Sequence, residues 1–201
     1  MTEPVHIRIL WPNETMNPYL VIGLVLACIV LMILEKLGVP TTLQLSFKGD
    51  VKRESAFLAQ WGQSVATPLA ALLVWQLDHS QPKHGLAVLL GPCVATTSCF
   101  ILKRLFGRVR PNREGAGRFL GPSLTHANWR ESFPSSHSAC AVALSMPLAH
   151  LYPAGALTFW ALAMITALLR YLLDAHWPSD VVGGVAVGYV SGAVVLRALG
   201  L

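Results

Sequence analysis

The chain has 201 residues, of which 54% are hydrophobic and only 12% are charged, and its mean hydropathy is +0.54. A soluble domain carries about a quarter charged residues, so this composition excludes an ordinary soluble protein. The net charge of +5 is uneven, because the basic residues gather between residues 103 and 130. This clustering predicts a local anionic partner, and no nucleic-acid-binding motif accompanies it.

Six apolar stretches follow one another along the chain, and each predicts a transmembrane helix. We therefore expect an all-α fold, a bundle of six transmembrane helices, with residues 1–201 forming a single membrane domain. The first 18 residues lack the basic start of a signal peptide, so the first helix is expected to remain as an anchor. The predicted helices cover residues 19–34, 56–77, 85–102, 138–151, 154–169 and 181–199.

The longest polar segment, residues 106–133, joins the predicted third and fourth helices and is rich in Gly, Arg and Pro. A disordered linker is one interpretation. We favour a site-forming loop, because the segment joins the charged end of one helix to a Pro-Ser-Ser-His start of the next. Arg108, Arg113 and Arg118 in this loop are candidates to meet a second phosphate or anionic lipids.

Two further patterns in the apolar segments predict structural roles. Gly184, Gly188 and Gly192 recur every four residues in the last predicted helix, and small residues at this spacing let helices pack closely in lipid. The cysteines form no C-x-x-C pair and lie in apolar stretches, so we expect buried free thiols rather than disulfides or metal ligands. These cysteines are Cys28, Cys93, Cys99 and Cys140.

Charged residues between the last two predicted helices are the strongest sign of function. Charge at such a depth is costly and is usually functional. His176 and Asp180 are four residues apart, so the carboxylate could reach one imidazole nitrogen and leave the other free to attack or to move a proton. Arg170 would supply a forked donor for phosphate or carboxylate. The alternative is a set of snorkelling end residues and a helix cap.

Three short motifs share one side of the predicted bundle, because alternate loops of six helices lie on the same face. The first is K-x6-R-P, from Lys103 to Arg110-Pro111. The second is Pro134-Ser135-Ser136-His137, at a predicted helix start. The third is Arg170-x5-His176-x3-Asp180.

In order and spacing, these motifs resemble those of the type 2 phosphatidic acid phosphatase superfamily, which also includes the vanadium haloperoxidases. The resemblance implies that His176 attacks phosphorus and forms a phosphohistidine, that Asp180 orients it, and that His137 protonates the leaving oxygen and then activates water. It also implies that phosphate is bound by Lys103, Arg110, Ser135, Ser136 and Arg170. Ser136 replaces the family's glycine and Leu169 its serine, and neither change removes a catalytic group.

The resemblance implies a membrane lipid phosphatase that acts on a lipid phosphate or diphosphate. Undecaprenyl diphosphate is the first candidate, ahead of phosphatidylglycerol phosphate, phosphatidic acid and lipid A. The sequence shows no clustered carboxylates, so we expect no metal or other cofactor. A non-hydrolytic binder or transporter of lipid phosphates is the alternative class. The vanadate-dependent relatives are soluble, which this chain is not.

The resemblance and the charge pattern disagree about orientation. The expected setting is the bacterial cytoplasmic membrane, surrounded by membrane lipids. The positive-inside rule alone would place the motif-bearing loops in the cytoplasm. The family more often works on the outer face, and many of the cations are candidate phosphate ligands, so we expect the active site on the outer face.

Overall fold

The computed structural model describes residues 16–43, 45, 47–125 and 127–201, so most of the first 18 residues, which lack the features of a signal peptide, lie outside them. The described chain is entirely helical, with no sheet, which confirms the all-α prediction. Its α-helices are α1 (Pro18–Lys36), α2 (Gly49–Leu58), α3 (Ala66–Leu77), α4 (Pro82–Phe106), α5 (Ser136–Leu151), α6 (Ala156–Leu172) and α7 (Pro178–Leu199), with short 3-10 turns at Asn128–Arg130 and Pro153–Gly155.

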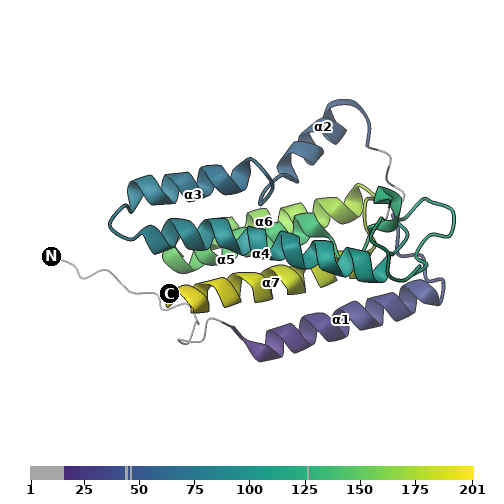
Figure 1. The fold of residues 1–201 in the computed structure, drawn as a ribbon. Coiled ribbons are helices and arrows are strands. Elements are labelled where there is room, and N and C mark those ends of the chain that lie inside the picture. Colours follow the sequence, from purple (N-terminus) through teal and green to yellow (C-terminus); the bar gives the residue numbers. More distant parts are fainter. Residues whose placement is uncertain (1–15, 44, 46, 126) are drawn as a thin grey trace.

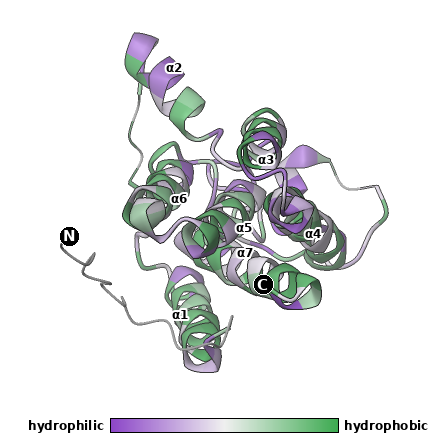
Figure 2. Cartoon of the chain, turned by 90° about the vertical axis from the view of Figure 1, so that its left-hand side faces the viewer, coloured by the Kyte–Doolittle hydropathy of each residue, from purple (hydrophilic) through white to green (hydrophobic). Residues whose placement is uncertain are grey.

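Helix α5 forms the centre of the bundle, and α4, α6 and α7 pack around it (Figures 1 and 2). Every residue from Ser138 to Ala149 is buried. The approach of α7 depends on its glycines, since a Cβ at Gly188 would lie 2.2 Å from the Ala139 carbonyl oxygen. A Cβ at Gly184 would lie 2.4 Å from the Ser135 carbonyl oxygen. These contacts confirm the packing role predicted for the glycine stripe.

The predicted helix over residues 56–77 is wrong, because the chain breaks there into α2 and α3. Gly62 lies at the break with φ +82°, and a Cβ on it would be 2.5 Å from the Ala141 nitrogen. Trp61 holds the bend against the core by donating from Nε1 to Ser145 Oγ at 2.9 Å. A glycine with positive φ pressed against α5 cannot continue a helix, and α2 projects from the bundle beyond it (Figure 2).

Four segments of the described chain are long and apolar enough to cross a membrane: Pro18–Lys36, Pro82–Phe106, Pro153–Leu172 and Pro178–Leu199. Helix α5 has 16 residues and α3 has 12, so both are shorter than a usual span. The protein is thus a helical membrane protein, and the count of six spans stays a prediction. Because the predicted second helix is two helices, the site-forming loop lies between α4 and α5.

One end of the bundle collects all the motifs. The C-terminal ends of α1, α4 and α6 lie there, together with the N-terminal ends of α5 and α7 (Figure 1). Lys103 and Arg170 lie in the last turns of α4 and α6, whereas both were expected in loops. The helices run further than the apolar pattern, which stops at the first charged residue of each.

The loop between α4 and α5 is ordered by backbone hydrogen bonds. Arg108 and Phe119 form an antiparallel bridge, and Val109 N donates to the Arg118 carbonyl at 3.0 Å. Further along, Arg110 N donates to Trp129 O at 2.9 Å, and Ser132 N donates to Arg108 O at 3.0 Å. The loop therefore folds back over itself, so its arginines and its C-terminal end lie side by side.

Candidate active site

One imidazole nitrogen of His176, Nδ1, is hydrogen-bonded, and the other, Nε2, has no hydrogen bond among the described residues. The residue is only 2% exposed, in the turn between α6 and α7. Its Nδ1 lies 2.8 Å from the carbonyl oxygen of Ser132. A carbonyl oxygen only accepts hydrogen bonds, so Nδ1 carries the proton and Nε2 keeps a lone pair. This is the tautomer that a nucleophilic Nε2 requires.

Asp180 lies on the Nδ1 side of the His176 imidazole and also caps the N-terminus of α7. Its Oδ2 lies 3.7 Å from His176 Nδ1, accepts a hydrogen bond from Ser132 Oγ, and accepts from Trp177 N at 3.0 Å. The Trp177 bond closes the first turn of α7, where a carboxylate is favourable. The carboxylate thus reaches the imidazole mainly through Ser132, and not by the direct hydrogen bond expected from the i, i+4 spacing.

Arg110 is clamped by the loops on both sides of it. Its Nε and Nη2 donate to the carbonyl and side-chain oxygens of Asn128, both at 3.0 Å, and its Nη1 donates to Ala175 O at 2.9 Å. A guanidinium has five N–H groups, so two have no hydrogen-bond partner among the described residues. Arg110 is therefore fixed next to the His176 turn with donors to spare.

Lys103 and Arg170 bring two more cations to the same place from α4 and α6. Lys103 is buried and donates from Nζ to Glu131 O at 2.5 Å. The buried Nε of Arg170 finds no acceptor among the described residues. The Nε atoms of Arg108 and Arg130 share this feature. The assignment of Lys103 and Arg170 to phosphate therefore rests on their place in the motifs and at this end of the bundle.

His137 completes the group in the first turn of α5. It lies within electrostatic range of Arg170, His176, Lys103 and Arg110. Ser135 is the N-cap of α5, and its Oγ accepts from Ser138 N at 3.4 Å and from Ser138 Oγ at 3.0 Å. The neighbouring Ser136 lies beside the Cys99 thiol. The structure thus brings both histidines and all three predicted cations to one end of the bundle. Ser135 has a partner in the first turn of α5, and Ser136 has one on α4.

Burial and neighbouring charge set the protonation of the site. Burial lowers the pKa of His176 to about 4; Asp180 opposes this shift, and Arg110 and Lys103 add to it. Burial likewise lowers the pKa of Arg110, against the opposing effect of Asp180 and Glu131. His176 is therefore neutral at physiological pH, as a nucleophile must be.

Four residues of the site were not predicted from the sequence, or were predicted in another role. Arg108 was expected at a second phosphate or at lipid, yet it is buried and donates from Nη1 to Asp180 Oδ1 at 2.5 Å. Ser132 orients His176, and Ser179 and Glu35 bind Arg108. In the sequence, these four residues are recognisable only as polar residues at or near the ends of apolar segments. That pattern does not show which of them contact one another in the folded chain.

The comparisons with known proteins agree with this geometry. Residues 84–200 match the model of the PAP2 superfamily, which is more than half of the chain. The chain therefore belongs to the PAP2 superfamily, and the resemblance noted in the motifs is confirmed. Comparison with the solved structures finds no match.

Several bacterial proteins are similar to this chain over part of their length. Lipid A 1-phosphatase of Rhizobium etli is 40% identical over 90 residues, which are 44% of this chain and 38% of that protein. Decaprenylphosphoryl-5-phosphoribose phosphatase of Mycobacterium tuberculosis is 39% identical over 108 residues, 52% of this chain and 55% of that protein. An undecaprenyl-diphosphatase candidate of Escherichia coli K12, YbjG, is 27% identical over 139 residues, 66% of this chain and 68% of that protein.

Proposed function

We propose that this protein is a membrane lipid phosphatase that works through a phosphohistidine on His176 and needs no metal. The observation that carries the proposal is the 2.8 Å contact from His176 Nδ1 to the Ser132 carbonyl, which directs the Nε2 lone pair away from the backbone. The cations on α4, α6 and the loop surround the same end of the bundle. Membership of the PAP2 superfamily and the names of its relatives support the same reaction.

The proposed reaction has two steps, phosphorylation of His176 and hydrolysis of the phosphohistidine. Burial and the neighbouring Arg170 lower the pKa of His137 to about 3, so His137 takes up its proton together with the anionic substrate, whose charge opposes that shift. His176 Nε2 attacks phosphorus as the bond from phosphorus to the lipid oxygen breaks, and His137 gives this proton to that oxygen. Water then attacks the phosphohistidine, His137 takes a proton from the water, and the P–N bond breaks to release phosphate. Lys103, Arg110 and Arg170 stabilise the negative charge that spreads over the equatorial phosphate oxygens in the transition state. Electrostatic catalysis of phosphoryl transfer requires such cations.

The substrate we propose is a lipid phosphate or diphosphate. The site lies at the end of a bundle of apolar helices, so a phosphate held there would project its lipid portion toward the membrane. Undecaprenyl diphosphate is the first candidate, and phosphatidylglycerol phosphate, phosphatidic acid and lipid A follow. The names of the relatives include both a lipid A 1-phosphatase and polyprenyl phosphatases, which keeps the candidates within lipid phosphates.

Phosphate release by the purified protein in detergent, with EDTA present, tests this proposal. We expect turnover of at least one lipid of the panel, and a loss of at least about 10³-fold in His176→Ala. His150→Ala is the matched control, because His150 is exposed in the last turn of α5 at the opposite end. A requirement for a divalent metal, or undiminished turnover by His176→Ala, would overturn the mechanism. Lipid flux in proteoliposomes without any turnover would favour a binder or transporter.

We also propose that the protein lies in the bacterial cytoplasmic membrane with its site on the outer face. A single reporter cysteine tests the orientation. Leu124, in the loop between α4 and α5, is 89% exposed, whereas Cys28, Cys99 and Cys140 are buried. In a Cys93→Ser background, Leu124→Cys should react in intact cells with a thiol reagent that cannot cross the membrane. Reaction only after lysis would place the site in the cytoplasm.

A further inference from the structure

Glu35, in the last turn of α1, makes an unusual set of buried contacts. Its side chain is 3% exposed, and its Oε2 accepts from Arg108 Nη2 at 2.7 Å and from Ser179 Oγ at 2.6 Å. Its Oε1 accepts from Ser179 N at 3.0 Å. A carboxylate at its own helix C-terminus is unfavourable, but this one also lies at the N-terminus of α7, where an anion is stabilised. Glu35 therefore acts on α7 rather than on α1.

Arg108 joins Glu35 to the candidate catalytic aspartate. The guanidinium is 2% exposed and donates from Nη1 to both Asp180 Oδ1, at 2.5 Å, and Ser179 Oγ, at 2.7 Å. Aromatic rings of Phe119 and Trp177 lie 5.1 and 5.3 Å from the guanidinium carbon. Both ion pairs of Arg108 are thus held in a fixed geometry, and each carboxylate uses a different guanidinium nitrogen.

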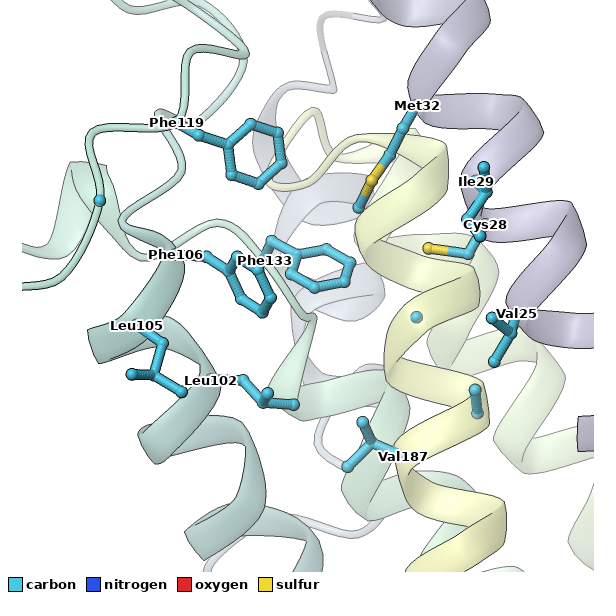
Figure 3. Close-up of a pocket in the computed structure, with 13 residues that line it drawn as sticks. Val25, Cys28, Ile29, Met32, Leu102, Leu105, Phe106, Phe119, Phe133 and Val187 are labelled. Carbon is cyan, nitrogen blue, oxygen red and sulfur yellow. The ribbon is translucent and has the colours of Figure 1, made fainter.

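An apolar groove adjoins this network at Cys28 and Phe119. The groove has a volume of about 620 Å³ and lies between α1 and α4 over α7 (Figure 3). Phe119, Phe133 and Cys28 line it, and the Cys28 thiol donates to the Ser179 carbonyl at 3.3 Å. With apolar walls on that side, water screens the ion pairs weakly, so removing one partner leaves a costly unpaired charge.

The charges of the network bear directly on His176. Glu35 and Asp180 each contribute one negative charge and Arg108 one positive charge, so the three together carry a net charge of −1. Without the Glu35 carboxylate, Arg108 and Asp180 together would carry no net charge. Asp180 would then offset less of the positive charge that develops on the imidazole when His176 attacks phosphorus.

We propose that Glu35 is a positioning residue of the active site, which keeps Asp180 negatively charged toward His176 by balancing Arg108. The inference rests on the proposed phosphatase function and extends the site to α1, outside residues 84–200 that match the family model. Glu35 touches neither His176 nor His137 by any hydrogen bond among the described residues, so it acts through Arg108 and Asp180.

The test compares Glu35→Gln, Arg108→Met and the double variant, with the wild-type protein as reference. We expect Glu35→Gln to lower the rate of enzyme phosphorylation by about 10- to 100-fold with little change in KM, because the loss falls on the transition state. Arg108→Met in that background should recover part of the rate, since it removes the unbalanced positive charge. Glu54→Gln is the control, as Glu54 is an exposed partner of Arg53 on α2.

Each outcome of this experiment decides the inference. An unchanged phosphorylation rate in folded Glu35→Gln overturns it, and so do losses that simply multiply in the double variant. Should Glu35→Gln fail to fold, Arg108→Met is compared with the double variant instead. Without Arg108 there is no positive charge for Glu35 to balance, so removing Glu35 should change the rate little, and a further loss of about 10-fold or more would overturn the inference. If the wild-type protein itself forms no phosphoenzyme, the failure belongs to the proposed function instead.

Discussion

The Nδ1 of His176 hydrogen-bonds to the carbonyl oxygen of Ser132 at 2.8 Å, while the Asp180 carboxylate lies 3.7 Å away. The backbone therefore sets the histidine tautomer, and the carboxylate contributes charge and holds Ser132 through its hydroxyl. This division of labour differs from a catalytic dyad in which a carboxylate alone orients the imidazole. It leads to a quantitative expectation for the aspartate.

Asp180→Asn should lower kcat by about 100-fold, less than the roughly 10⁴-fold loss seen when a carboxylate alone fixes the tautomer. The carbonyl of Ser132 still accepts from Nδ1 in this variant, so the tautomer is kept while the negative charge behind the imidazole and the ion pair with Arg108 are lost. Steady-state kinetics with protein shown to be folded in detergent measure this effect. A loss of 10⁴-fold in folded protein would mean that Asp180 sets the tautomer directly.

The low pKa of His176 predicts an acid-dependent loss of stability. The folded value of about 4 lies below the ordinary value of 6.5, so the unfolded chain binds a proton that the folded chain does not. Stability from this group is therefore present above pH 6.5 and is lost as the pH falls toward 4, at about 1.4 kcal/mol per pH unit.

Thermal unfolding in detergent from pH 7 to pH 4.5 tests this expectation. The Tm of the wild-type protein should fall more steeply with acid than the Tm of His176→Gln, which lacks the titrating group. Parallel curves for the two proteins would show that His176 titrates near its ordinary value.

Arg170→Lys should lower kcat/KM by about 10²-fold or more, because an ammonium cannot reproduce the forked donor set of a guanidinium toward phosphate. The matched control is Arg197→Lys: both arginines lie in the last turn of a helix, but Arg197 is exposed at the end of α7 away from the site. Competition by vanadate, a phosphate analogue, measures anion affinity directly. Equal effects of the two substitutions would remove Arg170 from the phosphate site.

The close approach of α7 to α5 makes Gly188 intolerant of any side chain. A methyl group would lie 2.2 Å from the Ala139 carbonyl oxygen, so Gly188→Ala should destabilise the protein by about 1–3 kcal/mol through overpacking. Gly23→Ala on α1 is the control, since a Cβ there meets nothing within 4 Å. Thermal unfolding of both variants checks the difference, and an undisturbed Gly188→Ala would mean that α5 and α7 are further apart.

The sequence was sufficient to predict the convergence of the three motifs, because alternate ends of antiparallel helices must share a face. It also predicted α5 and α7 to within three residues at each end. It could not predict the break at Gly62, since the steric contact with Ala141 involves two segments far apart in the chain. Hydropathy alone therefore began the second helix at residue 56, across the break and ten residues before α3 begins at Ala66.

The partners of Arg108 could not be predicted from the sequence for a related reason. An arginine two residues before Arg110 in a basic loop looks like another phosphate or lipid ligand. Its burial depends on Glu35, which lies 73 positions earlier at the end of α1. Spacing rules describe neighbours within one helix or loop, so they cannot pair residues from α1, the loop and α7.

The central claim is that His176 carries the phosphoryl group, and rapid acid-free quenching with a ³²P-labelled lipid phosphate tests it most directly. We predict an acid-labile, base-stable label on the peptide that contains His176, and a label that decays more slowly in His137→Ala because water is no longer activated. Turnover accompanied by label on another residue, or by no label in either protein, would contradict the account.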